Sequence, residues 1–234
     1  MTPLLLLFGG VSPLVAVGTD LWCAAITKTA ASRLHYRAGL IEWRVARRLW
    51  MGSLPAAVLA LCWVRAYGGR SALLSAAIGA VVVVSAVGML LQSRLHAAGR
   101  SLRTGHAARF KRLQAPLTIL AGAMLGVLVT VTSVGAGALG AVLLSYLYPF
   151  RLTAPRLVAT DIVHAVPLAV FAGLGHLFIG NVDIMLLLVL LAGSIPGVIA
   201  GVLFSARLTH ASVRRLLVAV LLVAGGRLIW VVFR

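Results

Sequence analysis

The stretch Val158-Ala159-Thr160-Asp161 decides how the chain is interpreted, because its counterpart, Val17-Gly18-Thr19-Asp20, stands 141 residues earlier. The same offset places residues 17–57 on residues 158–198 without a gap. Chance matches of Leu, Val and Ala are common in an apolar sequence, whereas matches of Thr, Asp, His, Gly and Pro in one register are not. The identical positions in the first copy are Val17, Thr19, Asp20, Ala24, Ala31, His35, Gly39, Leu49, Gly52, Ser53 and Pro55. This register indicates an internal duplication.

The acidic residues follow the same duplication. The chain has 4 of them, and they form two equivalent pairs, Asp20 with Asp161 and Glu42 with Asp183.

Composition predicts a helical membrane protein. Of 234 residues 62% are hydrophobic and 11% charged, whereas about a quarter of the residues of a soluble domain are charged. Several apolar runs approach the roughly 20 residues that a helix needs to cross a bilayer. We expect a multi-pass protein of the cell membrane, which is the inner membrane in a Gram-negative bacterium. The expected helices cover residues 13–32, 42–64, 71–92, 116–134, 155–175, 182–205 and 213–233, with short apolar pieces at 3–9 and 139–150.

The net charge of +17 belongs to 21 basic residues that lie mainly between the apolar segments. This placement favours topogenic charge that meets anionic lipid headgroups. Nucleic acid is not an expected partner, because base-reading motifs and stacking platforms are absent from the sequence. No metal spacing, cofactor motif or catalytic constellation is visible either, so we do not expect an enzyme.

Charge also predicts the topology. The basic linker 93–115 is expected in the cytoplasm, between a first repeat (1–92) and a second repeat (116–234). Counting helices from it places the arginine-bearing loop 33–41 on the same side. The equivalent loop 176–182 has no Lys or Arg and falls on the opposite side. The predicted fold is therefore all-α, a polytopic membrane protein with two inverted-topology repeats and broken helices.

The duplication also leads us to expect a missing segment. The stretch 116–139, moved back by the same offset, falls before Met1, so about 25 residues of the first repeat are expected to be absent. Either the start codon is assigned too far downstream, or the protein is shortened and its pocket is half-built.

The first candidate site is the break at Thr132-Ser133-Val134-Gly135-Ala136-Gly137. Broken membrane helices free backbone N–H groups, which suit an anion at the start of the next helix. Thr132, Ser133, Gly135 and Gly137 are therefore candidate substrate-binding residues. The alternative is a close-packing site between helices, which small residues serve equally well.

The second candidate site contains the intramembrane acids. Asp20 and Asp161 could each take up a coupling proton, since a carboxylate inside a membrane helix is a functional candidate by default. Alternatively, they cap free N–H groups of a broken helix. Thr19 and Thr160 precede them and are candidate substrate ligands. His164 could relay protons or simply form a hydrogen bond with a neighbour.

Three further residues are candidate substrate ligands. Lys28 could supply a fixed positive charge for an anion, or its ammonium could extend to the membrane interface. Ser53 and Ser194, each in a Gly-Ser-x-Pro motif, could donate hydrogen bonds to the substrate. The alternative for these motifs is helix bending with tight packing.

These motifs together resemble the TauE/SafE family of sulfite exporters and related permeases. The residues that carry the resemblance are Thr132–Gly140, Ala159–Pro167 and Gly193–Gly197 in the second half, and Met1–Leu7, Ala16–Asp20 and Lys28-Thr29 in the first. The resemblance covers nearly the whole chain and implies a multi-pass transporter of inverted-repeat design for sulfite, sulfonates or other small organic anions. Family members usually carry a glycine-rich segment ahead of the stretch that Met1–Leu7 matches, and this chain lacks it.

We therefore expect a secondary transporter for a small anion, with proton coupling through Asp20 or Asp161. The alternative is a non-transporting membrane subunit, or a remnant of such a carrier. A homodimer is a further expectation that the sequence leaves open.

Overall fold

The computed structural model describes residues 1–8, 10–67, 71–105, 107–135, 137–205, 218–227 and 230. All the regular secondary structure in these ranges is helical, which confirms the all-α class. The helices are α1 (Thr2–Phe8), α2 (Pro13–Arg37), α3 (Trp43–Tyr67), α4 (Ser71–Gly105), α5 (Ala107–Thr132), α6 (Ala138–Leu147), α7 (Ala154–Ile179) and α8 (Ile184–Ser205), with a further helical segment at Val218–Arg227.

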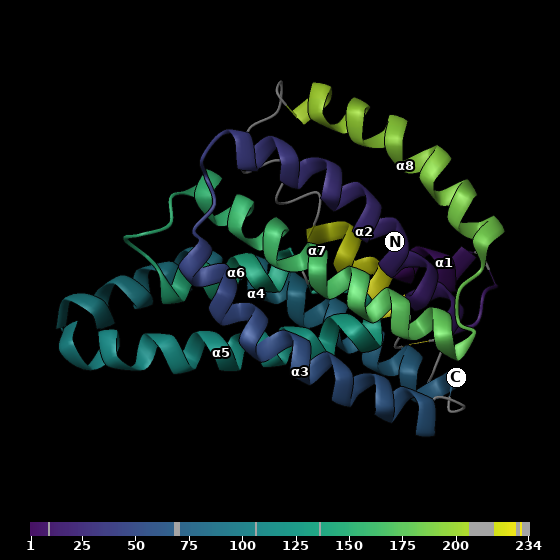
Figure 1. Ribbon diagram of the computed structural model, residues 1–234, viewed down its shortest axis with the longest axis horizontal. Helices are drawn as coiled ribbons and strands as arrows, with labels where there is room; N and C mark the ends of the chain where they lie inside the picture. Colours follow the sequence, from purple (N-terminus) through teal and green to yellow (C-terminus); the bar gives the residue numbers. More distant parts are fainter. Residues whose placement is uncertain are drawn as a thin grey trace.

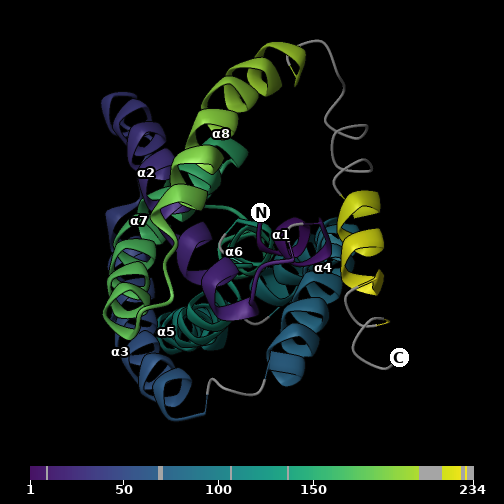
Figure 2. The same cartoon turned by 90° about the vertical axis from the view of Figure 1, so that its right-hand side faces the viewer.

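The long helices form one bundle. α7 packs against both α2 and α3, α5 packs against α3, and α8 lies beside α2 (Figures 1 and 2). An apolar core joins α2, α4, α5 and α7 through Val17, Ile78, Val129 and Leu168. Short α6 packs mainly against α4 and also contacts α5 and α7, so the glycine break that precedes it is held inside the bundle.

Two equivalent glycines end two of the helices. α2 continues past its expected end to Arg37, and Gly39 follows with a φ of 64°. α7 ends at Ile179, and Gly180 follows with a φ of 87°. A residue with a Cβ would pay about 1–2 kcal/mol for this left-handed backbone, so both glycines are required by the turns that they form.

The basic stretch 93–115, expected to be a linker, is helical wherever the structure describes it. α4 runs through to Gly105, and α5 begins at Ala107, so Pro116 lies inside α5 and not at its start. The stretch has 5 Ala and 5 Arg residues, which have high helix propensity, so its described residues are helical despite their charge.

Three described helices are long and apolar enough to cross a membrane, namely Trp43–Ala66, Lys111–Thr132 and Ala154–Ile179. A fourth span results if Ala76–Gln92 and Arg94–Ser101, bent by 62° at their junction, are counted together. Within the expected helix 213–233, the described residues 218–227 are helical, and the remaining positions apart from 230 lie outside the described residues. Large apolar side chains on the outer surface include Leu59, Leu120 and Phe178, which are 71%, 66% and 87% exposed. Such a surface is suited to lipid.

α3 and α5 approach each other through glycines. A Cβ at Gly52 would lie 2.7 Å from the backbone N of Ala123, and one at Gly126 would lie 2.7 Å from the Cα of Ser53. Gly122 meets the backbone of α3 in the same way. Small residues at this interface therefore bring the two backbones into direct contact.

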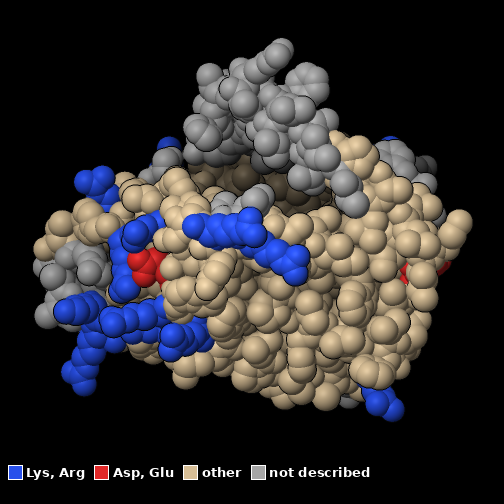
Figure 3. All heavy atoms as spheres, turned by 45° about the horizontal axis from the view of Figure 1, so that its top comes forward, with Lys and Arg blue, Asp and Glu red and all other residues tan. Residues whose placement is uncertain are grey.

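Charge gathers at one end of the molecule. Figure 3 shows most of the Lys and Arg side chains on its left, around an acidic residue. Glu42 lies in such surroundings: its carboxylate accepts hydrogen bonds from Arg151 at 2.9 Å and from Arg156 at 3.1 Å. By the positive-inside rule this basic end is the one expected to face the cytoplasm.

Candidate functional site

The stretch between α5 and α6 breaks the helical path, as predicted. Ser133, Gly135 and Gly137 all have positive φ, at 56°, 113° and 129°. Thr132 stabilises the turn because its hydroxyl accepts a hydrogen bond from the N–H of Val134 at 3.1 Å. Positive φ is uncommon outside glycine, so Ser133 is held in a strained conformation at the break.

The start of α6 offers fewer free N–H groups than expected. The carbonyl oxygen of Gly135 accepts hydrogen bonds from the N–H groups of Leu139 at 3.1 Å and of Gly140 at 3.2 Å. The N–H groups of Leu139 and Gly140, which we expected to be free to bind an anion, are thus already hydrogen-bonded within the turn. The hydroxyl of Ser133 is buried and has no hydrogen-bond partner within the described part of the chain.

Asp161 lies against the first turn of α6. Its Oδ1 atom approaches Gly140 so closely that a Cβ there would collide with it. The residue is 4% exposed, and Oδ1 has no hydrogen-bond partner among the described residues. An unpaired buried oxygen costs about 1–3 kcal/mol, and more when the group is charged. The carboxylate is therefore placed where a proton or a ligand would stabilise it.

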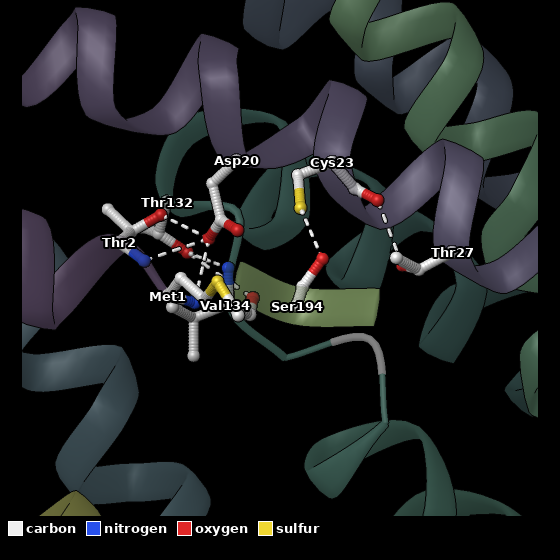
Figure 4. Close-up of polar contacts among 8 residues, drawn as sticks. All are labelled: Met1, Thr2, Asp20, Cys23, Thr27, Thr132, Val134 and Ser194. Atoms are coloured by element: carbon white, nitrogen blue, oxygen red, sulfur yellow. Dashed lines mark hydrogen bonds and ion pairs between the residues drawn. The ribbon is translucent and has the colours of Figure 1, made fainter. Parts of the chain in front are cut away.

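Asp20, the equivalent acid, has a different environment. It is 5% exposed, and its Oδ2 accepts hydrogen bonds from the N–H of Thr2 at 2.8 Å and from the Thr2 hydroxyl at 2.6 Å (Figure 4). The Met1 nitrogen lies 3.0 Å from the same oxygen. Asp20 thus caps the start of α1, which is the alternative that the sequence offered for both acids.

Lys28 lies on α2, two turns beyond Asp20. It is half-buried, and its ammonium lies in the electrostatic field of the Asp161 and Asp20 carboxylates. One cation on α2 thus lies in the field of two acids, one on α2 and one on α7.

The equivalent threonines make equivalent contacts. The hydroxyl of Thr160 accepts a hydrogen bond from the N–H of Glu42 at 3.1 Å, and that of Thr19 accepts one from the N–H of Asp183, also at 3.1 Å. Each copy of the duplication therefore anchors the helix start of the other. Both hydroxyls are used in these anchors, which makes them structural contacts first.

The serines of the two Gly-Ser-x-Pro motifs also contact equivalent positions. Ser53 lies 3.0 Å from Nε2 of His164, and Ser194 lies 3.8 Å from the sulfur of Cys23. Cys23 and His164 are again 141 residues apart. His164 is fully buried, and its Nδ1 has no partner within the described chain.

Sequence reasoning missed three residues of this site. Thr2 bonds Asp20, Cys23 contacts Ser194, and Trp50 donates a hydrogen bond to the carbonyl oxygen of His164 at 3.1 Å. The offset of the duplication would have indicated Cys23, since it occupies the position of His164. No comparable signal marks Thr2 or Trp50.

Comparison with known proteins agrees with this architecture. The model of the family described as sulfite exporter TauE/SafE matches residues 1–228. The "Probable membrane transporter protein YjnA" of Bacillus subtilis (strain 168) is 34% identical over 237 aligned positions, which cover 98% of this chain and 90% of that protein. No solved structure matches the chain significantly.

The comparisons do not support the expected loss of about 25 residues from the first repeat. The family match begins at residue 1, and the relative is covered over nine-tenths of its length. The offset led to that expectation because it assumed that both repeats have the same elements at their starts. A multi-pass helical chain with buried acids beside a broken helix, matched by the family over almost its whole length, belongs to the TauE/SafE sulfite exporter family of membrane transporters.

Proposed function

We propose that this transporter is a secondary carrier for sulfite, organosulfonates or related small anions, and that Asp161 takes up the coupling proton. The observation that supports this proposal is the difference between the two equivalent acids. Asp20 is hydrogen-bonded to the start of α1, whereas Asp161 keeps one buried oxygen without a partner in the described chain.

The geometry suggests how a proton and an anion would bind together. While Asp161 is ionised, its negative charge attracts the ammonium of Lys28 and offsets the positive charge of that ammonium. When Asp161 is protonated, its charge no longer offsets that of Lys28, and the net positive field attracts an anion towards the start of α6. Because an ion pair is strong in a medium of low dielectric constant, binding of the proton and of the anion would favour each other.

The reciprocal contacts support an inverted arrangement of the repeats. Thr19, near the start of α2, accepts a hydrogen bond from Asp183, which lies between the end of α7 and α8. Thr160, near the start of α7, accepts one from Glu42, which lies between the end of α2 and α3. α2 and α7 therefore run in opposite directions (Figure 1). An inverted repeat of this kind places the substrate near the bilayer midplane, between the broken helices.

Flux measurements in proteoliposomes test the proposal. We expect sulfite or methanesulfonate flux to be accelerated by a pH gradient, and we expect Asp161→Asn to abolish that acceleration. Asp183→Asn is the matched control, since Asp183 is exposed and an amide can still cap α8. If Asp161→Asn responds to the gradient as the parent protein does, the coupling role is refuted; if no sulfur oxyanion is moved, the substrate class is refuted.

A second variant tests the role of the cation. Removing a charged partner costs about 1.5–3 kcal/mol, so Lys28→Gln should raise the half-saturating anion concentration by about ten- to a hundredfold. An unchanged half-saturating concentration would assign Lys28 a structural role.

The alternative of a non-transporting remnant loses its main support. It depended on the missing first segment, for which the comparisons give no evidence.

A further inference from the structure

A cavity of about 420 Å³ lies where the end of α2, the start of α3 and the first half of α7 meet. Its lining includes Arg33 and Arg37 from α2, and three aromatic side chains, Tyr36, Trp43 and Trp50. Of these residues only Trp50 also contacts the proposed transport site, through its hydrogen bond to the carbonyl oxygen of His164.

The three aromatic rings form a continuous series along the cavity. The centroids of Tyr36 and Trp43 are 6.3 Å apart with the ring planes at 74°, and those of Trp43 and Trp50 are 6.4 Å apart. Tyr36 is 65% exposed and Trp43 is 41% exposed. Trp and Tyr gather at membrane interfaces because their rings are apolar and their N–H and O–H groups are polar.

The α7 side of the cavity continues into an exposed apolar stripe of that helix. Its floor includes Val163 and Pro167, and the same stripe of α7 continues through Phe171 and Leu174, which are 41% and 38% exposed. Asp161 and Leu168 are buried on the opposite face of the helix. An occupant would therefore enter from the lipid and not along the substrate path.

Charge determines which lipid would fit. Arg33 and Arg37 are one helical turn apart, and both are exposed residues of the cavity lining. A guanidinium matches a phosphate through paired hydrogen bonds. Basic pockets between membrane helices on the cytoplasmic side suit anionic lipid headgroups, and an apolar floor suits acyl chains.

The other copy of the duplication shows that the fold does not require this set of residues. Positions 33, 36, 37, 43 and 50 correspond to Leu174, Leu177, Phe178, Ile184 and Leu191. The first four of these are 38–87% exposed. The same positions thus face outward in both copies, but arginine and ring N–H or O–H groups occur in one copy only.

We propose that this cavity is a specific site for an anionic phospholipid, with the lipid phosphate bound by Arg33 and Arg37 and the acyl chains lying along Trp43, Val163 and Pro167. The arginines neutralise the headgroup, and the aromatic rings fix its depth at the interface. The site is independent of transport and does not require that the substrate assignment be correct.

Native mass spectrometry of the detergent-purified full chain, titrated with phosphatidylglycerol or phosphatidylcholine, tests the proposal. We expect saturable binding of phosphatidylglycerol at one site and no saturable binding of phosphatidylcholine. Each arginine near a membrane surface contributes about 1 kcal/mol to the binding of anionic lipid. Arg33→Gln with Arg37→Gln should therefore weaken phosphatidylglycerol binding by about 30-fold.

The control is Arg44→Gln with Arg47→Gln, because these arginines are exposed on α3 and outside the cavity. This variant should bind phosphatidylglycerol as the parent chain does. Equal losses in both double variants would indicate unspecific charge attraction, and no loss in either would place the lipid elsewhere. Displacement by free glycerol phosphate at matching concentration would indicate a site for a soluble anion. A dimer that dissociates only in the Arg33/Arg37 variant would indicate a subunit interface. Each of these results overturns the proposal.

Discussion

The two intramembrane acids should respond differently when each is replaced by its amide. Asp20→Asn should lower stability, whereas Asp161→Asn should abolish proton coupling. Asp20 accepts two hydrogen bonds from Thr2, at 2.8 Å and 2.6 Å, in a buried position. Hydrogen bonds to a charged acceptor contribute about 1.5–3 kcal/mol each, and neutral ones about 0.5–1.5. Asp20→Asn should therefore lower the free energy of unfolding by about 2–3 kcal/mol. Asp161→Asn removes no described hydrogen bond, so it should lower stability less than Asp20→Asn does.

Thermal unfolding in one detergent, followed by intrinsic fluorescence, measures this difference. For a chain of this size 1 kcal/mol corresponds to about 2–4 °C, so Asp20→Asn should unfold roughly 4–12 °C below the parent protein. Thr2→Val in the parent chain should lower the unfolding temperature by part of that amount. In the Asp20→Asn background the same substitution should lower the unfolding temperature by less than it does in the parent chain. If Asp161→Asn is the less stable of the two variants, the structural assignment of Asp20 is wrong.

Three further predictions concern packing and surface charge. Gly126→Ala should lower the free energy of unfolding by about 1–3 kcal/mol, because the new Cβ meets the backbone of α3. The control is Gly193→Ala, which has open space around it and should not lower the free energy of unfolding in the same measurement. Ser53→Ala should cost about 1–3 kcal/mol, because it leaves Nε2 of His164 unpaired in the core; an unchanged midpoint would refute that hydrogen bond. Glu42→Gln should cost at most about 1 kcal/mol, since both of its arginine partners are nearly half exposed, and the loss should shrink as salt is added.

The sequence predicted the features that depend on periodicity and duplication. The all-α class and the break after Thr132 follow from local chemistry, and the structure confirms them. The expected ends of α2 and α7 are residues 32 and 175, but both helices continue further, to Arg37 and Ile179. The offset of 141 also paired the residues that turn out to make reciprocal contacts.

The remaining features depend on packing that local patterns do not encode. Charge density in 93–115 indicated a linker, yet helix propensity extends α4 and α5 through it. Equivalence in sequence predicted similar roles for Asp20 and Asp161, yet only the fold places Thr2 beside the first and Gly140 beside the second. The Gly135 carbonyl that occupies two amides of α6 could not be anticipated from residue types either.

The glycine contact between α3 and α5 has a consequence for motion. Gly52 lies in the first half of the chain and Gly122 and Gly126 lie in the second, so the contact joins the two halves. Backbones that touch at Gly52, Gly122 and Gly126 cannot slide past each other without collision. We therefore expect α3 and α5 to move together as one unit that joins the two halves. If the protein opens alternately to the two sides of the membrane, we expect the other helices to be displaced around this pair.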